Sequence, residues 1–588
     1  MSPLAKERAS VLSINPYQVW HCGPIFSQVA STVGPVRVVA TAGQVGVDAQ
    51  GVLIKDPEAQ IEQAFKNLRR CLEAAGARVQ DVFKMVWYIV NYDHKNRLYR
   101  KSLIEFLGGH RPATTACAVL ALAEPDYVFE VEAYAAVPQS PVQSVDVVVV
   151  GAGLSGLKAA YEVQKAGYSC LVVEARDRVG GKTYSVDPLG ENKYVDLGAA
   201  WINDTNQSHI YALAMSLGLD MIVQNTTGHV IQEDIGGQLS SYAYGDVPKE
   251  LAEPHSVEDM IAIRDLTEKI CQSIDLYHPV ATGEDLDKYT LEDWVKQKGL
   301  GKTALASVTI WTRVMLGLEP SDMSALYFMD YCRSGGGLLR MRSDKNDGGQ
   351  YLRLVRGTQS ISEELSKLLS HEEILVSAGR GDIRCKRVIV SIPTPLYKEI
   401  KFSPSLPPAK QELSHFNKLG YQMKVMLLYA KPWWRAHNLC GMLQSFKGPV
   451  CVTRDSSVEE KGQYSLTCFV SGQKGIELST GTKQARHAAV LSQIKKVYSP
   501  FVHGPIPEPL EIAEHEWAND QWAQGCPCPV SPPGVMTKYG HALRTPYGKV
   551  HFVGTETAFE CKGYMDGAVR SGERGAAEVI HMLSRAGI

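Results

Sequence analysis

The feature that most constrains this chain is an apolar run that leads directly into a glycine-rich turn. Residues 145–150 read Val-Asp-Val-Val-Val-Val, typical of a buried parallel strand, and residues 151–156 read Gly-Ala-Gly-Leu-Ser-Gly. Apolar residues recur on one face of residues 154–166, and Gly167 follows, so a helix is predicted there. Residues 169–173 predict a second strand. The segment therefore predicts a strand–helix–strand unit of an α/β fold.

Each glycine of this turn has a separate physical use. Gly151 permits the tight turn, Gly153 lets a pyrophosphate approach the backbone, and Gly156 lets the helix and the strand pack closely. The helix N-terminus, with Ser155 in its first turn, attracts phosphate charge. Glu174, at the end of the second strand, would accept hydrogen bonds from the ribose of an adenosine. A lone glycine fingerprint is weak evidence, but here both strands, the helix and the acid accompany it, so dinucleotide binding is predicted.

The next residues identify the dinucleotide by resemblance. Residues 174–183, Glu-Ala-Arg-Asp-Arg-Val-Gly-Gly-Lys-Thr, resemble the second signature of the monoamine oxidase and polyamine oxidase superfamily, which binds FAD rather than NAD. The resemblance implies that Arg176 and Lys182 lie at the cofactor. Where the family usually has an arginine near the pyrophosphate, Lys182 keeps the charge and loses the planar fork.

Two stretches in the middle of the chain resemble parts of the same family that face the flavin. Residues 196–201, Asp-Leu-Gly-Ala-Ala-Trp, imply that Ala199 lies at the flavin and that Trp201 borders the substrate cavity; a place in the core is the alternative for Trp201. Residues 419–434 resemble the strand that carries the family's one buried lysine, here Lys424. In the family this lysine holds a water against flavin N5, and burial would lower its pKa because desolvation disfavours the charged form.

The C-terminal region resembles the family's last flavin motif. Residues 550–557 predict a buried strand that ends in a polar turn, and residues 563–567 open a helix. The resemblance implies that Glu556 contacts the ribityl chain and that the helix starting near Met565 directs backbone N–H groups at the flavin pyrimidine edge. It also implies that Tyr564 is one wall of the aromatic cage that guides an amine to the flavin.

The second wall of that cage is altered. Residues 517–527 resemble the mitochondrial monoamine oxidases around their flavin-linked cysteine, but Pro527 stands where the second cage tyrosine would be. The cavity should therefore be wider or differently shaped. Cys526 aligns with the cysteine that forms a thioether to the flavin, and both covalent and noncovalent FAD stay open because the neighbouring residues differ. Cys526 and Cys528 do not suggest a metal, since no second cysteine pair or histidine cluster accompanies them.

The N-terminal region predicts a small α+β domain. Asp56 can cap a helix that begins at Pro57, and apolar residues fall on one of its faces before Gly76. A second amphipathic helix is predicted over residues 97–107. The predicted strands are residues 36–42, 82–90, 115–121 and 127–137.

This region resembles the RidA (YjgF) enamine and imine deaminases. The matching stretches are Thr-Ala-Gly-Gln at 41–44, Glu-Ala-Ala-Gly at 73–76, Arg-Pro-Ala at 111–113 and Glu-Val-Glu-Ala at 130–133. The family implies a trimer with clefts between subunits. Its members that hydrolyse 2-imino acids hold the carboxylate with an arginine, and Ala121 stands at that position, so bidentate recognition is lost. Glu132 matches an acid of the cleft; hydrolysis of an imine without a carboxylate stays open beside a purely structural, oligomerising role.

Composition excludes several classes of protein. A net charge of −2 with 21% charged residues gives no basic field for nucleic acid or for a charged membrane. No signal peptide and no run of about 18 apolar residues is evident. The odd number of cysteines, 13, has no repeating spacing, which argues against a disulfide framework. A soluble protein of the cytoplasm is expected.

The prediction is a RidA-like α+β domain followed by a Rossmann-type α/β domain with an interleaved substrate-binding part. The stretch rich in proline and small polar residues before the strand at 145–150 predicts a linker. The expected boundaries are 1–137 for the RidA-like domain, 138–144 for the linker and 145–588 for the oxidase. Within the oxidase, FAD binding is expected at about 145–225, 350–400 and 530–588, and substrate binding at about 226–349 and 401–529.

The resemblance implies a reaction. A hydride would leave the carbon of an unprotonated amine for flavin N5, giving an imine that hydrolyses to a carbonyl and ammonia, with O2 reduced to H2O2. The RidA-like domain would then handle the imine. One rival is desaturation or cyclisation of a specialised metabolite, because Pro527 alters the cage, with the RidA-like domain only structural. A second rival is a noncatalytic flavoprotein scaffold, against which Lys424 and Tyr564 both argue.

Overall fold

The computed structural model describes residues 11–16, 19, 25–32, 36–138, 143–249, 251, 253–369, 374–376 and 383–586. The chain divides into two compact units, one formed mainly by the residues up to Ser144 and the other mainly by those from Val145 onward. Most of the predicted linker, residues 139–142, lies outside the described residues, as do residues 1–10. The ends of the linker belong to strands, because one strand ends at Pro138 and the next begins at Gln143.

The N-terminal unit is built on a five-stranded sheet in which β4 joins β7 beside the main order β3-β7-β5-β6. Strand β5 runs parallel to β6 and antiparallel to β7. A separate hairpin pairs β1 with β2. The bounds are β1 Val11–Ile14, β2 Val29–Thr32, β3 Val36–Ala40, β4 Gln44–Val45, β5 Val82–Val90, β6 Ala113–Val119 and β7 Phe129–Pro138.

Two helices accompany this sheet, α1 (Pro57–Ala74) and α2 (Tyr99–Leu107). Asp56 caps α1 as predicted, since its carboxylate accepts a hydrogen bond of 2.9 Å from the backbone N–H of Ala59. The apolar face of α1 packs with residues of β5 and β7 in one core. The alternation of buried and exposed positions thus places one face of the sheet against the helices.

The larger unit contains a five-stranded sheet of order β16-β9-β8-β17-β23. The predicted strand–helix–strand unit is present as β8 (Gln143–Val150), α3 (Leu154–Lys165) and β9 (Cys170–Glu174), and β8 and β9 are parallel. Helix α16 (Met565–Ala586), the last of the chain, packs on α3. The remaining strands are β16 Ile374–Val376, β17 Ile383–Val390 and β23 Val550–Phe552.

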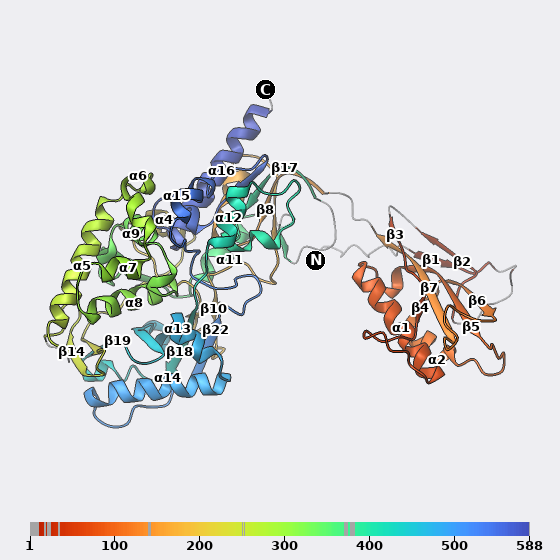
Figure 1. Ribbon diagram of the computed structural model, residues 1–588, viewed down its shortest axis with the longest axis horizontal. Coiled ribbons are helices and arrows are strands. Elements are labelled where there is room, and N and C mark those ends of the chain that lie inside the picture. The colour runs from red at the N-terminus through yellow and green to blue at the C-terminus, as the bar shows by residue number, and fades with distance from the viewer. Residues whose placement is uncertain are drawn as a thin grey trace. The chain divides into compact units, whose positions relative to one another are not determined.

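A seven-stranded sheet of order β14-β13-β19-β20-β21-β18-β22 forms a second layer of this unit. Helix α8 (Lys302–Leu316) contacts β18, β20 and β21, so it covers the centre of that sheet (Figure 1). The strands are β13 His229–Glu233, β14 Leu239–Ala243, β18 Gln422–Tyr429, β19 Leu439–Ser445, β20 Val450–Asp455, β21 Tyr464–Ser471 and β22 Glu511–Glu516.

Between β14 and α9 the chain forms α5 (Ser256–Ser273), α6 (Pro279–Gly283), α7 (Leu291–Lys296) and α8. Pro279 is the first residue of α6, and Gly301 is the N-cap of α8. The other elements are α4 Ser208–Ser216, α9 Ala325–Ser334, α10 Leu338–Met341, α11 Gln359–Lys367, α12 Pro408–Phe416, α13 Gly472–Ser479, α14 Lys483–Tyr498, α15 Val535–Tyr539, β10 Ser185–Val186, β11 Val195–Asp196, β12 Met221–Val223 and β15 Leu352–Leu354.

Among the helices of the described residues, none has both the length and the apolar character needed to cross a lipid bilayer. All cysteines in this part of the chain are free.

Candidate functional site

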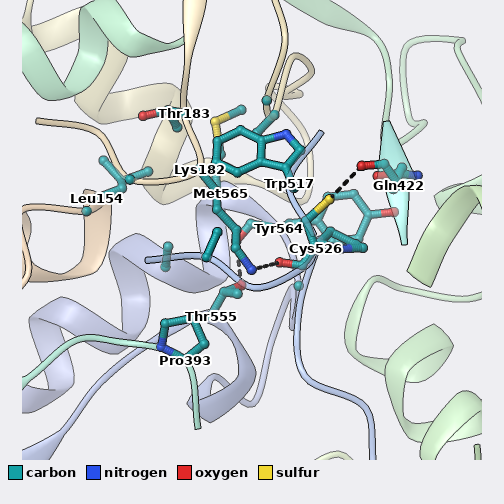
Figure 2. A pocket seen from close by; sticks show the side chains of 18 of the residues that line it. Leu154, Lys182, Thr183, Pro393, Gln422, Trp517, Cys526, Thr555, Tyr564 and Met565 are labelled. Atoms are coloured by element: carbon teal, nitrogen blue, oxygen red, sulfur yellow. Dashed lines mark hydrogen bonds between the residues drawn. The ribbon is translucent and has the colours of Figure 1, made fainter. Parts of the chain in front are cut away.

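A cavity of about 540 Å³ lies in the larger unit, and its walls come from the unit's five-stranded and seven-stranded sheets and from α8. Nearly every residue that the sequence singled out for the cofactor or the chemistry lines it. They are Gly151, Gly153, Ser155, Glu174, Arg176, Lys182, Ala199, Trp201, Lys424, Cys526, Glu556, Tyr564 and Met565. Gly156 is the exception, because it packs behind the turn. Figure 2 shows Lys182, Cys526 and Tyr564 together in this cavity.

The glycine-rich turn has the local structure that a phosphate needs. Gly151 adopts a φ of 103°, which disfavours a side chain. A Cβ on Gly156 would collide with the carbonyl oxygen of Gly151, so α3 can lie this close to β8 only with glycine there. Gly153 is the N-cap of α3 and faces open space where its Cβ would be. The first N–H groups of α3 are therefore exposed to whatever fills the cavity.

Glu174 holds the turn in place. Its carboxylate accepts hydrogen bonds from the backbone N–H groups of Ala152, at 2.7 Å, and Arg176, at 3.0 Å. The guanidinium of Arg176 pairs with Asp520, with Nη2 and Oδ1 2.5 Å apart. A carboxylate at the end of β9 thus orients the backbone next to the site where a ribose would bind.

Lys182 lines the cavity and follows Gly180 and Gly181, which lie against Gly153 of the turn. Its Nζ donates to the carbonyl oxygen of Pro527 at 3.2 Å. Burial lowers the pKa of Lys182, while Cys526 and Glu556 lie close enough to oppose that shift. The ammonium of Lys182 therefore connects the glycine-rich turn to the Cys526–Pro527 segment.

Lys424, on β18, is the buried cation of the site. Its side chain donates to the carbonyl oxygen of Gly198 and, at 3.4 Å, to that of Asp196. Desolvation lowers the pKa of Lys424 to about 8. Burial raises the pKa of the Asp196 carboxyl, which accepts hydrogen bonds from the Ser185 hydroxyl and the Thr358 backbone.

Two aromatic rings cover this ammonium. Lys424 Nζ lies 4.8 Å from the ring centre of Trp201 and 5.5 Å from that of Phe469, which is on β21. The two rings stack with their centres 5.9 Å apart. Trp201 Nε1 donates to Gln224 at 2.9 Å. Trp201 therefore lies at the cavity wall beside the lysine, and it also packs against a buried apolar cluster.

Tyr564 closes another side of the cavity, directly before α16. Its ring stacks on Tyr331 of α9, with the centres 6.3 Å apart and the planes at 22°. The hydroxyl of Thr555 donates to the Tyr564 carbonyl at 2.7 Å, which fixes the backbone where α16 begins at Met565. Burial raises the pKa of Tyr564, so the phenol is neutral at physiological pH.

Cys526 has its thiol inside the cavity, where it donates to the carbonyl oxygen of Gln422 at 3.3 Å (Figure 2). Burial raises the pKa of this thiol to about 11. Pro527 also lines the cavity, whereas Cys528 is fully buried with its sulfur 3.8 Å from the Tyr327 hydroxyl. The two cysteines therefore face different surroundings.

Glu556 ends the segment after β23. Its carboxylate accepts hydrogen bonds from the backbone N–H of Thr394, at 2.9 Å, and from its hydroxyl, at 3.0 Å. Burial raises the pKa of Glu556. The acid therefore links the loop after β17 to the loop after β23 at the cavity wall.

Sequence motifs did not identify the remaining wall. Phe469, Met442 and Val452 come from the strands β19–β21, Ile310 and Trp311 come from α8, and two arginines, Arg342 and Arg454, complete it. On these strands almost every residue is buried, so the two-residue alternation that would mark an inward face is absent.

In the N-terminal unit, Glu132 lies on β7 opposite Val86 of β5. The negative charge of its carboxylate is the main cause that raises the pKa of Tyr88, a phenol on the same sheet. Ala121 lies just beyond the end of β6 and is exposed. Glu132 thus lies on a strand of this sheet, and Ala121 lies just past the end of another strand of it.

The cavity suits a dinucleotide. It offers N–H groups without a side-chain cap at the start of α3, room at Gly153 for a phosphate, an acid at the end of β9, and two lysines, Lys182 and Lys424, in its wall. Such a donor set matches a negatively charged cofactor with a ribose and a second, uncharged ring system.

Comparison with known families agrees with this division. Residues 154–580 match the family described as flavin containing amine oxidoreductase. Residues 25–137 match the family described as endoribonuclease L-PSP.

Individual relatives cover the larger unit. Amine oxidase [flavin-containing] A of Sus scrofa is 32% identical over 464 residues, which are 75% of this chain and 86% of that protein. Amine oxidase [flavin-containing] B of Mus musculus is 31% identical over 461 residues, 75% of this chain and 87% of the relative.

Solved structures give the same picture. Putrescine oxidase bound to putrescine superimposes with a TM-score of 0.68 at 26% identity and covers 75% of this chain and 100% of its own. Cyclohexylamine oxidase from Brevibacterium oxydans IH-35A also has a TM-score of 0.68 at 26% identity, over 75% of this chain and 99% of its own.

Proposed function

Because this chain belongs to the family of flavin-containing amine oxidoreductases, whose cofactor is FAD, we propose that it oxidises a small amine with O2 in the cavity of its larger unit. The balanced overall reaction consumes amine, O2 and water and yields a carbonyl compound, ammonia or a smaller amine, and H2O2. The observation that carries the proposal is the position of Lys424, buried under Trp201 and Phe469 in the same cavity as the phosphate-binding turn.

The cofactor would lie in the cavity and contact residues from the beginning and from the end of the larger unit. Gly151, Gly153, Ser155 and the start of α3 would hold the pyrophosphate, with Gly156 behind them and Glu174 at the ribose. The other residues proposed to contact FAD are Arg176, Lys182, Ala199, Cys526, Glu556 and Met565. When bound, FAD supplies the acceptor for the hydride that leaves the carbon next to the nitrogen.

The chain's own residues prepare that step. Trp201, Phe469 and Tyr564 form apolar walls that exclude water from the reacting carbon. Lys424 directs its ammonium into the cavity, where it can position a water by donating a hydrogen bond. With a pKa of about 8, it can also change its charge within the working pH range. The amine must bind unprotonated, since its lone pair stabilises the positive charge that develops as the hydride leaves.

A second candidate reaction follows from Pro527. This residue lines the cavity where the family's second cage tyrosine would stand, and the ring stacked on Tyr564 is instead Tyr331 of α9. A cavity shaped in this way also suits desaturation or oxidative cyclisation of a bulkier specialised metabolite. Peroxide released without ammonia would favour this second reaction.

Anaerobic titration of the purified flavoprotein tests the proposal. We expect one class among primary, secondary and polyamines and amino acids to bleach the flavin absorbance near about 450 nm. If no amine bleaches it while the flavin is still reduced by dithionite, amine oxidation is excluded for this cavity.

For the N-terminal unit, we propose that it hydrolyses the imine with Glu132 as its acid and base, without gripping a carboxylate because of Ala121. We also propose that the unit ends at residue 137 and assembles as a trimer. In full-length Glu132→Gln, H2O2 should form at the wild-type rate while ammonia lags behind it. Glu105→Gln on the exposed face of α2 is the matched control. Identical lags in both variants and in the wild type would assign the unit a structural role only.

A further inference from the structure

One wall of the oxidase cavity carries an arginine that no acid neutralises. Arg342 directly follows α10 and lines the cavity, and its guanidinium carbon lies 4.9 Å from the ring centre of Trp311 on α8. The side chain is partly buried. Among the described residues, Arg342 makes no ion pair and no side-chain hydrogen bond, and its guanidinium lies over the Trp311 ring at the cavity wall.

The groups around Arg342 leave a net positive charge. Its charged neighbours are Arg454, Arg264 and Asp344, and the tyrosines 242 and 244 also face it. Asp344 is already paired with Arg454, with Oδ2 and Nη1 2.7 Å apart, and Arg264 is paired with Asp265 at 2.7 Å. Asp344 thus pairs with Arg454, and Arg342 makes no ion pair with it.

The guanidinium stays charged in spite of this crowding. Burial, followed by repulsion from Arg454, lowers the pKa of Arg342 to about 10, which is still well above neutral pH. A charge removed from bulk water without a partner is costly, and a wall that faces a cavity leaves room for a ligand to provide the partner. An arginine fork matches the two oxygens of a carboxylate.

Apolar side chains lie between the cavity wall that holds Arg342 and Arg454 and the end of the cavity at Lys424, where the reaction is proposed to occur. Arg454 Nη1 lies 3.4 Å from the sulfur of Met442, and Met442 packs in the same cluster as Trp201 and Phe469, which cover Lys424. A substrate that reaches from Lys424 to Arg342 would therefore pass an apolar stretch and meet a cation.

From this arrangement we propose that the natural substrate is an amine that carries a carboxylate, and that Arg342 binds that carboxylate. The inference rests on the proposed amine oxidation and deepens it by naming the substrate class. It is independent of the N-terminal unit, where Ala121 offers no cation for the same group.

The experiment compares amines that differ only in the carboxylate, using the full-length holoenzyme under anaerobic conditions. The pairs are phenylalanine with 2-phenylethylamine and 6-aminohexanoate with hexylamine. Stopped-flow flavin reduction gives an apparent Kd and a limiting rate for each. In at least one pair the acid should bind about 10- to 100-fold more tightly than its neutral partner, as expected for a charge-assisted hydrogen-bonded pair.

Variants assign the effect to the residue. Arg342→Gln should raise the apparent Kd of the acid to that of the neutral amine, so that the ratio of the two values falls to about one; Arg342→Lys should keep part of the preference. Arg340→Gln, on the exposed end of the same short helix, should change neither value. Flavin content confirms that each variant is folded. As a second readout, 3-phenylpropanoate should compete with substrate better than 3-phenylpropanamide, and only when Arg342 is present.

The outcomes separate the two proposals. If neutral amines reduce the flavin as well as or better than their acids, or if a preference for acids survives in Arg342→Gln, the carboxylate inference is overturned and amine oxidation stands. If no compound of either kind reduces the flavin, both proposals fail.

Discussion

Replacing Lys424 by methionine tests the centre of the proposed site, because the chain offers a matched control. Lys410 is also a buried lysine: it donates to the carbonyl oxygen of Ala542 at 2.6 Å and lies 3.7 Å from the ring centre of Phe552. It does not line the cavity. Desolvation lowers the pKa of Lys410 to about 7 and that of Lys424 to about 8.

The effect of both changes on stability should be modest. Lowering a lysine pKa from 10.5 to about 8 corresponds to a cost of about 3 kcal/mol for the charged form, which methionine avoids. Methionine also leaves a buried backbone carbonyl without its hydrogen-bond donor, which lowers the free energy of unfolding by about 1–3 kcal/mol. Because the folded pKa lies below the unfolded one, the charge cost is present below pH 8 and disappears as the pH rises toward 10.5. Each variant should therefore fold at pH 7.

Their effects on the reaction should differ. A hydrogen bond from a charged donor is worth about 1.5–3 kcal/mol, which corresponds to about a 10- to 100-fold change in rate. We expect anaerobic stopped-flow traces to show flavin reduction slowed by this factor in Lys424→Met and unchanged in Lys410→Met. In addition, the absorbance spectrum of the oxidised flavin should titrate with a pKa near about 8 in the wild type and in Lys410→Met only. Equal reduction rates for Lys424→Met and the wild type would refute the role given to Lys424.

Further changes address the cofactor and the cavity walls. Acid precipitation should leave the flavin in the protein pellet through Cys526, whereas Cys526→Ala should release it to the supernatant; a colourless wild-type pellet would show noncovalent FAD. Gly153→Ala should fold, since its Cβ meets open space, yet bind about 10-fold less FAD because the methyl group occupies the phosphate approach, as flavin content per protein would show. Tyr564→Leu should slow flavin reduction by about 10-fold through a looser substrate position, and an unchanged rate would remove Tyr564 from the site.

Parts of the fold that depend on local sequence signals could be predicted from the sequence. The cap Asp56, Pro57 and the apolar stripe define α1, and β-branched and aromatic residues define β5 over Val82–Val90. The cofactor turn is equally local, because its glycines lie within six residues of one another. In each case the residues that determine the structure are neighbours in the chain.

The substrate end of the cavity could not be predicted in this way. Phe469, Arg342 and Arg454 come from β21, from the residue after α10 and from β20, and only the folded chain brings them together. Their strands are buried along almost their whole length, so no period marks the side that faces the cavity. No sequence motif surrounds Arg342. Only the folded structure shows that no acidic side chain of the described residues forms an ion pair with it.

The packing of α16 on α3 sets the order of events during synthesis. The glycine-rich turn is synthesised well before Cys526, Glu556 and α16, which complete its surroundings. Until those residues have been added and have folded, the nascent chain presents only half of the cofactor site, and FAD cannot be enclosed. Shortening the chain by its last helix would consequently cost the protein its flavin, although the fingerprint at the other end of the unit would be intact.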